Sequence, residues 1–284
     1  MRKMRKMMVA QWLLSLWIAF AFTGIALAQP GNLTLKSHAA LIFDSQQGQA
    51  IYGKNADAVL PIASITKLMT AMVVLDAQLP LDEQITVEVA DIDVLKNTRS
   101  RLWLGASLSR RDMLHLALMA SENRAAAALG RAYPGGIEAF VTAMNRKAQS
   151  LGMNRSHFVD STGLNSANVS TARELASMVE AAYQYDIIRE FTTTAAHAVD
   201  VSNQSRSLQF INSNNLVRAG KWDIGVSKTG FLNEAGRCLV MQAMIIGKPV
   251  IIVLLDSVGK QTRTGDANRI RKWMESNLPR KHLG

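Results

Sequence analysis

The sequence predicts an α+β fold in which a sheet lobe is interrupted by a mainly helical lobe. Strand-like runs of apolar residues occur near the start of the chain and again toward its end, whereas apolar residues at helical spacing dominate the middle. This order predicts a sheet lobe formed by residues of about 38–60 and 195–280, a helical lobe of about 65–190, and a cleft between the two lobes.

The first elements follow closely on one another. Residues 39–44 and 49–52 have the composition of strands, and the turn-prone residues 45–48 join them into a hairpin. From position 64 to 75 apolar residues recur at helical spacing, and Pro61 marks the entry to this helix.

Further along, residues 109–112 are typical of a capping box that starts a helix. The remaining predicted elements are helices at about 136–151, 171–185 and 266–277 and strands at 223–228, 237–246 and 250–255.

The N-terminal residues predict export. Four basic residues between positions 2 and 6 precede an apolar run at 12–22, and residues 26–28 supply the small-residue pattern of a cleavage site. The run is short for a bilayer span of about 20 residues, which favours a cleaved signal peptide over an uncleaved anchor. We therefore expect residues 1–28 to be removed after Ala28, leaving a mature chain that begins at Gln29.

Composition and charge limit the number of domains, the kinds of binding partner and the cofactors that this chain can have. Removal of the basic N-terminal segment lowers the formal charge from +10 to +6 and leaves residues 29–284, enough for one large domain. The positive charge suits either an anionic polymer or an ordinary solvated surface. Nothing in the sequence resembles a nucleic-acid module. The five histidines are scattered and a zinc-type cluster is lacking, so we expect neither a metal nor another cofactor.

Cys238 is the one cysteine, so an intramolecular disulfide cannot form. It stands in an apolar strand-like run, which favours a buried, inert thiol over a nucleophile.

Three short motifs in a fixed order carry the chemistry. They are Ser64-Ile65-Thr66-Lys67, Ser121-Glu122-Asn123 and Lys228-Thr229-Gly230. Each alone is weak, because Ser257-Val258-Gly259-Lys260, Ser166-Ala167-Asn168, Ser213-Asn214-Asn215 and Arg263-Thr264-Gly265 fit or nearly fit the same patterns. Context favours Ser64, which opens an apolar helix, over Ser257, which we expect in a turn after a strand.

Ser64 and Lys67 have the spacing of a nucleophile and its base. Residues three apart on a helix share a face, with about 5–6 Å between Cβ atoms, so Lys67 can reach the Ser64 hydroxyl. A serine hydroxyl needs a base, and burial together with the charge of Lys228 would lower the pKa of Lys67 enough for that role. The plainer interpretation makes Ser64 a helix N-cap and Lys67 a solvated charge; likewise, Ser121 and Asn123 could simply cap the helix that follows them.

The three motifs resemble those of the low-molecular-mass penicillin-binding proteins, the serine-type D-alanyl-D-alanine peptidases. The segments that add to this resemblance are 140–145, 151–153, 161–164 and 170–172. The resemblance implies a β-lactamase/penicillin-binding-protein transpeptidase-like fold, with an antiparallel sheet, flanking helices and a mainly helical lobe.

The resemblance also implies a role for each matching residue. Ser64 would be acylated with Lys67 as base, and Ser121 would relay a proton to the leaving amine. Asn123 would bind the substrate backbone, and Lys228 and Thr229 would bind its carboxylate, beside Gly230 at the end of a strand. The backbone N–H groups of Ser64 and Phe231 would form the oxyanion hole. Arg263 receives no role.

The larger carboxypeptidases of this family carry an added β-rich domain and a C-terminal membrane anchor, whereas this sequence ends at Gly284. It therefore looks closest to the small D-alanyl-D-alanine endopeptidase branch, which cuts crosslinks between peptidoglycan peptide stems. Removal of a terminal D-Ala is the alternative activity, and an idle periplasmic binding protein is a third. A class A β-lactamase is disfavoured because residues 157–169 contain no glutamate.

These expectations extend to partners and location. The enzyme should act on peptidoglycan stems, react covalently with β-lactam antibiotics as inhibitors, and reside in the periplasm. We expect no stable membrane anchor after signal cleavage, because the last helix carries few bulky apolar residues.

Overall fold

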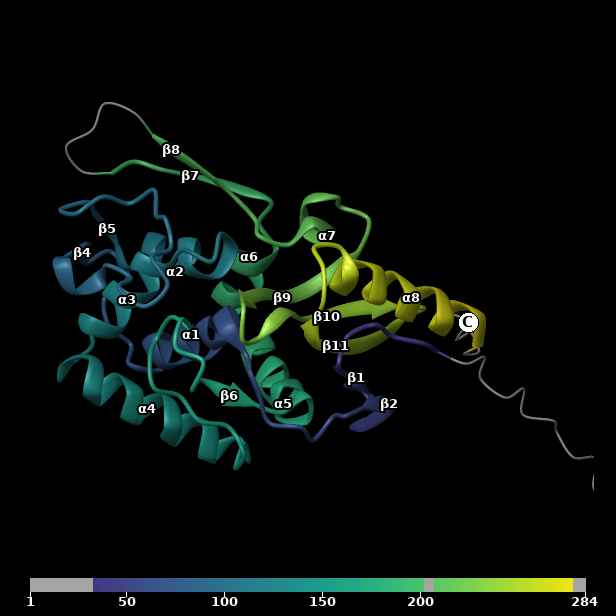
Figure 1. The fold of residues 1–284 in the computed structure, drawn as a ribbon. Coiled ribbons are helices and arrows are strands. Elements are labelled where there is room, and N and C mark those ends of the chain that lie inside the picture. Colours follow the sequence, from purple (N-terminus) through teal and green to yellow (C-terminus); the bar gives the residue numbers. More distant parts are fainter. Residues whose placement is uncertain (1–32, 202–206, 278–284) are drawn as a thin grey trace, which may run out of the picture. The chain divides into compact units, whose positions relative to one another are not determined.

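The computed structural model describes residues 33–201 and 207–277 (Figure 1). The expected signal peptide and its cleavage site lie outside these residues. Among the helices in these two ranges, none is both long enough and apolar enough to cross a membrane.

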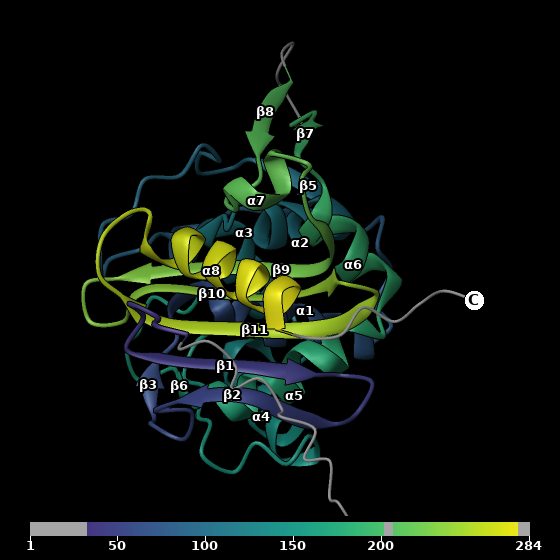
Figure 2. The ribbon, with the colours of Figure 1, turned by 90° about the vertical axis from the view of Figure 1, so that its right-hand side faces the viewer.

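A five-stranded sheet joins the two ends of the described chain (Figure 2). Its strands, in spatial order, are β2 (Gln49–Lys54), β1 (Ala39–Asp44), β11 (Lys248–Ser257), β10 (Gly236–Ile245) and β9 (Asp223–Leu232), all antiparallel. The predicted hairpin of β1 and β2 is confirmed. Pairing of β1 with β11 brings the N-terminal hairpin beside the C-terminal strands, which leaves β9 as an edge strand.

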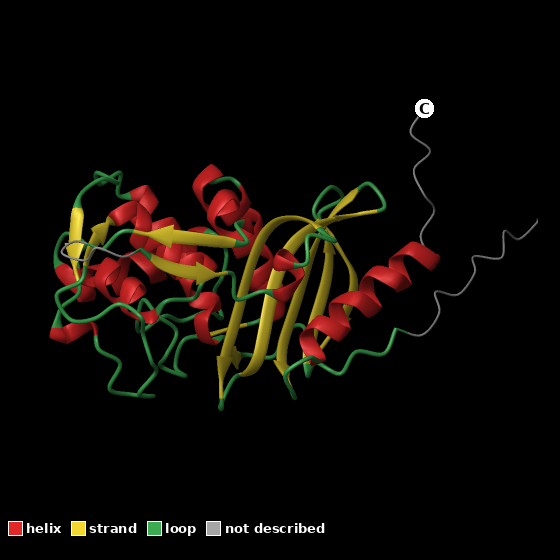
Figure 3. Cartoon of the chain, turned by 90° about the horizontal axis from the view of Figure 1, so that it is seen from above, coloured by secondary structure: helices red, strands yellow, loops and turns green. Residues whose placement is uncertain are grey.

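Both faces of the sheet are buried, because its central strands are continuous apolar runs. In β11, Ile251, Val253 and Leu255 point into the core shared with the helices, and the alternate residues point into a second core beneath α8 (Thr262–Asn277). Figure 3 shows α8 on the outer face and the other large helices on the opposite side. The last helix begins four residues earlier than its predicted start at 266.

The helical part surrounds α1 (Thr66–Asp76), whose residues from Thr66 to Val74 are all buried. Four helices contact it: α2 (Arg110–Met119), α3 (Asn123–Arg131), α4 (Gly136–Ser150) and α5 (Ala172–Tyr183). A helix buried all round needs apolar residues on every face, as this one has. The predicted helices at 136–151 and 171–185 are confirmed as α4 and α5, and the hydroxyl of Ser109 caps α2 as expected by accepting from the Asp112 N–H.

Sequence reasoning missed several smaller elements. They are α6 (Asp186–Thr193), α7 (Asn215–Arg218), η1 (Ala63–Ile65), η2 (Val89–Asp91), β3 (Leu60–Pro61) paired with β6 (Val169–Ser170), β4 (Gln84–Thr86) paired with β5 (Ser107–Ser109), and β7 (Ala196–Val199) paired with β8 (Leu208–Ile211). The β7–β8 hairpin forms its own sheet and does not extend the five-stranded one.

Candidate active site

Ser64 lies in the 3₁₀ turn η1, immediately before α1. The expectation that it opens the α-helix is therefore wrong by two residues. Its alternative role as an N-cap is wrong too, since Ile65 occupies the cap position of α1 and no side chain caps that end. Ala63, just before Ser64, has φ +48°, a conformation rare for a residue with a Cβ and common at functional sites. The turn holds the half-buried Ser64 hydroxyl at the surface of the core.

Lys67 connects three segments of the chain. Its Nζ lies 2.8 Å from Oγ of Ser64, 2.7 Å from Oδ1 of Asn123 and 2.6 Å from the carbonyl oxygen of Thr162. The side chain is fully buried. A neutral amine has two N–H donors and one lone pair, so donation to Asn123 and Thr162 leaves the lone pair for the Ser64 hydroxyl.

Burial lowers the pKa of Lys67 from 10.5 to about 7, against the opposing influence of the carboxylates of Asp160, Glu122 and Asp93. The sequence-based argument expected Lys228 to contribute to this shift. The effect is instead on Lys228. Its pKa is lowered well below its ordinary value, first by burial and then by the positive charges of Lys67 and Arg263.

The orientation of the Asn123 amide is fixed by a chain of hydrogen bonds. Oγ1 of Thr98 donates to Oδ2 of Asp93 at 2.7 Å, so that hydroxyl is left to accept from Nδ2 of Asn123 at 2.9 Å. Oδ1 of Asn123 then faces Lys67. Sequence reasoning missed Asp93 and Thr98, which lie 30 and 25 positions before Asn123 and outside any motif.

Thr162 was also missed as a contact of Lys67, because a backbone carbonyl leaves no signature in side-chain patterns. Its loop is organised by Asp160, whose Oδ1 accepts from the N–H groups of Thr162 and Gly163, both at 2.6 Å. Gly163 has φ +80°, and a Cβ there would lie 2.0 Å from the carbonyl oxygen of Ala63. Only glycine allows this loop to approach the turn that carries Ser64.

Ser121 lies between α2 and α3 with φ +62°. Its Oγ accepts a 2.8 Å hydrogen bond from Nζ of Lys228. The alternative role of Ser121 and Asn123 as caps is wrong, because Glu122 is the N-cap of α3 and accepts from the Arg124 N–H.

Lys228, Thr229 and Gly230 lie within β9 and not at its end, since the strand continues to Leu232. Lys228 is buried, and Oγ1 of Thr229 donates to Oγ of Ser213 at 2.7 Å. A Cβ at Gly230 would lie 3.0 Å from the carbonyl oxygen of Ile62 and 3.2 Å from the backbone nitrogen of Ser64. The glycine therefore lets β9 pass directly beside the serine.

Phe231 follows on the same strand with half of its surface exposed, and the Arg237 guanidinium lies 4.3 Å from its ring centroid. Arg263, to which the sequence gave no role, donates from Nη1 to the carbonyl oxygens of Gly230 at 2.8 Å and Cys238 at 3.0 Å. Arg263 thereby links β9, which carries the Lys228-Thr229-Gly230 motif, to β10.

The competing serine lies elsewhere. Ser257 is the last residue of β11 and is buried, not in a turn, and its hydroxyl is 2.7 Å from that of Ser37. Ser37 in turn donates to Asp266 of α8 at 2.6 Å, so Ser257 belongs to a structural network beneath that helix. Cys238 is buried as expected, and burial raises the pKa of its thiol to about 11. Within 33–201 and 207–277, no group of three or more His, Cys, Asp or Glu side chains could hold a metal ion.

Comparison with known proteins finds similar sequences and a similar fold among D-alanyl-D-alanine peptidases. The sequence profile of the D-alanyl-D-alanine carboxypeptidases, peptidase S11, matches residues 25–259. The chain is 47% identical over 279 residues to a D-alanyl-D-alanine endopeptidase of Escherichia coli K12, covering 96% of this chain and 90% of the relative. It is 48% identical over 247 residues to a D-alanyl-D-alanine endopeptidase of Pseudomonas aeruginosa, covering 87% and 80%. The crystal structure of the Streptomyces K15 DD-transpeptidase superposes with a TM-score of 0.79 at 30% identity, covering 86% of this chain and 98% of that one.

The fit between Gly163 and Ala63 predicts the effect of an added methyl group. Gly163→Ala should lower the free energy of unfolding by more than the roughly 1 kcal/mol that a left-handed residue costs, because its Cβ would also clash with the Ala63 carbonyl. Gly152→Ala is the matched control, since Gly152 has φ +72° but open space around it. Urea unfolding of both variants measures the difference, and equal losses would contradict the clash.

Proposed function

Because the chain belongs to the D-alanyl-D-alanine carboxypeptidase family, we propose that Ser64 is the residue that this serine D,D-peptidase of peptidoglycan acylates. The observation that carries the proposal is the 2.8 Å contact between Ser64 and a buried Lys67 whose pKa is about 7. A base is most effective when its pKa lies near the working pH.

Acylation then proceeds in the order that the contacts support. Lys67 takes the Ser64 proton as Oγ attacks the carbonyl carbon of D-Ala, and the backbone N–H groups of Ser64 and Phe231 stabilise the oxyanion. Ser121 relays a proton to the leaving amine, aided by the hydrogen bond from Lys228 to its hydroxyl. Water later hydrolyses the ester.

The substrate binds along the edge strand β9. Lys228 and Thr229 bind the carboxylate of the leaving residue, and Asn123 offers its second amide hydrogen to the peptide backbone. With the carboxylate at Lys228 and the reacting carbonyl at Phe231, the acyl part of the substrate continues toward Leu232. The peptide therefore runs antiparallel to β9.

We further propose that the preferred reaction is hydrolysis of the D-alanyl crosslink between stems, with release of terminal D-Ala as the alternative. Two relatives that carry the name endopeptidase, each at 47% or 48% identity, support this preference. The same chemistry predicts covalent inhibition by β-lactams. The proposed setting is the periplasm, with one catalytic domain from residue 29 to 284, cleavage after Ala28 and no stable membrane anchor.

The assignment of Ser64 predicts covalent labelling by penicillin at that residue. Labelled penicillin should form a stable adduct that peptide mass mapping places on Ser64, and Ser64→Ala should form none. Ser257→Ala is the control and should label as the wild type does. An adduct on Ser257, or one that persists in Ser64→Ala, would contradict the assignment of Ser64.

The base role of Lys67 predicts how acylation depends on pH. The neutral amine is the active form, so the rate should rise with pH through about 7 and fall about tenfold per unit below it. Lys67→Arg should lose about 10²–10⁴-fold in rate, since arginine stays protonated. Stopped-flow acylation by a chromogenic β-lactam between pH 5 and 9 measures both, and a flat profile or a folded, active Lys67→Arg protein would disprove the role.

The preference for crosslinks predicts the outcome of a competition. With a crosslinked dimeric muropeptide and a monomeric pentapeptide at equal concentration, monomers from the dimer should appear faster than free D-Ala. The ratio of kcat/KM values defines the specificity. Faster D-Ala release would move the enzyme to the carboxypeptidase alternative with the same catalytic residues.

A further inference from the structure

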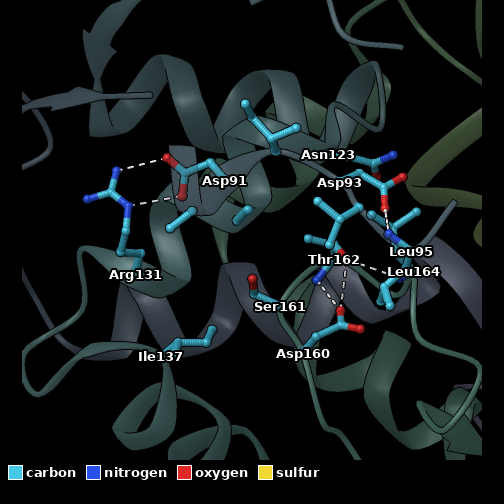
Figure 4. A pocket seen from close by; sticks show the side chains of 14 residues that line it. Asp91, Asp93, Leu95, Asn123, Arg131, Ile137, Asp160, Ser161, Thr162 and Leu164 are labelled. Atoms are coloured by element: carbon cyan, nitrogen blue, oxygen red, sulfur yellow. Dashed lines mark hydrogen bonds and ion pairs between the residues drawn. The ribbon is translucent and has the colours of Figure 1, made fainter. Parts of the chain in front are cut away.

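Two cavities differ in their relation to the candidate active site. One adjoins Lys67, since its lining includes Asn123 and Thr162, which both accept hydrogen bonds from that lysine (Figure 4). The other, the Glu180 cavity, has a volume of about 230 Å³ and is lined by Ser45, Glu180, Tyr183, Gln242, Pro249 and Ile251 among others. None of the described residues that line the Glu180 cavity belongs to the candidate active site, so it needs an explanation of its own.

Gln242 presents an unpartnered amide to the Glu180 cavity. It lies on β10 with 4% of its surface exposed. Its strand partner Ile251 points into the core shared with the helices, so Gln242 points there too. Within 33–201 and 207–277 its amide has no hydrogen-bond partner. A buried amide without a partner costs free energy, because it has lost its hydrogen bonds to water.

The backbone of β9 makes room for this amide. A Cβ at Gly225 would lie 2.2 Å from Oε1 of Gln242 and 2.4 Å from a ring carbon of Tyr183. Glycine weakens the interior of a strand and often marks a place where another group approaches closely. Gly225 therefore allows two side chains of the cavity wall to lie against β9.

Two further polar groups of the cavity lack partners in the described part of the chain. The Ser45 hydroxyl oxygen is buried and unpaired, although its backbone N–H donates to the Pro249 carbonyl oxygen at 3.1 Å. The Glu180 carboxyl is half-buried, and burial alone raises its pKa. A segment after β1, the helix α5 and the strand β10 thus each direct an unsatisfied polar group at one cavity.

Two cations beside the cavity are already paired. Lys248, the residue before a lining proline, lies 3.7 Å from Asp44. Arg189, which packs over the ring of a lining tyrosine, forms an ion pair with Asp186. The negative charge of Glu180 is therefore left uncompensated, which favours a cationic ligand.

We propose that the Glu180 cavity is a second binding site, which takes a small molecule with a primary ammonium group and a short uncharged body. The ammonium group has three N–H donors, and the Glu180 carboxylate, the Ser45 hydroxyl and the Gln242 amide oxygen supply three acceptors. The uncharged body lies against Pro249 and Ile251. The volume lies below the roughly 300–1,000 Å³ of drug-sized sites, so the body has only a few heavy atoms. The inference is independent of the function proposed above.

The test uses n-butylammonium as the probe, with n-butanol and butanoate as matched neutral and anionic compounds. NMR titration of the protein should show saturable shifts with n-butylammonium, largest at the backbone amides of Ser45 and Gly225. The other two compounds should bind at least about tenfold more weakly, because they lack the charge that pairs with Glu180. Absence of saturable shifts would mean that the cavity holds only water. That result, equal binding of n-butanol, or largest shifts at Ser64 would overturn the proposal.

A charge-removing variant connects the binding to the cavity. Glu180→Gln keeps the shape of the side chain and removes its charge, so the Kd for n-butylammonium should rise about tenfold or more. Glu138→Gln, at an exposed position of α4 outside the cavity, is the matched control and should bind as wild type does. An unchanged Kd in Glu180→Gln would contradict the site.

Gln242→Met distinguishes a ligand contact from a structural role. Methionine has a similar length but no amide, so this variant removes a buried polar group that has no partner in the described protein. Its urea midpoint should match or exceed that of wild type, whereas n-butylammonium should bind severalfold more weakly. Unchanged binding would overturn the role of the amide, and Glu180→Gln remains the test if Gln242→Met does not fold.

Discussion

The candidate active site depends on one buried amine. Burial of a lysine costs several kcal/mol when its charge is retained, and here the whole side chain of Lys67 is buried. The neutral form avoids most of that cost, and it needs acceptors for its two N–H groups, which Asn123 and Thr162 supply. The same burial that disfavours the charged form therefore lowers the pKa of the amine, and its lone pair is left facing Ser64.

The surrounding structure serves to hold those acceptors in place. Asp93 fixes Asn123 through Thr98, and Asp160 fixes the carbonyl of Thr162 by binding the loop on both sides of it. Both carboxylates raise the pKa of Lys67 and so oppose the lowering of that pKa by burial. The Lys67 pKa of about 7 reflects two opposing effects. Burial lowers it, and the carboxylates that hold the acceptors in place raise it.

Sequence patterns predicted the parts of the site that depend on side-chain chemistry. Ser64, Lys67, Ser121 and the β9 motif are all brought together, and the strands and main helices lie close to their expected positions. Thr162 was not predictable as a contact, since its carbonyl is common to every residue and only the tertiary fold brings it to Lys67. The sequence also wrongly predicted that β9 ends at the Lys228-Thr229-Gly230 motif. Glycine is unusual inside a strand, and Gly230 is explained only by the close approach of Ser64, which the sequence does not reveal.

The proposed mechanism also explains why the motifs leave the preferred reaction open. In the proposed mechanism both reactions expel an amine and leave the same D-alanyl ester on Ser64, so they differ only in the leaving group. Groups that contact only the acyl part of the substrate therefore cannot distinguish the two reactions. That distinction must arise on the other side of Ser64, beyond Lys228 and Thr229, where Ser213 contacts the motif strand and the chain returns from the β7–β8 hairpin.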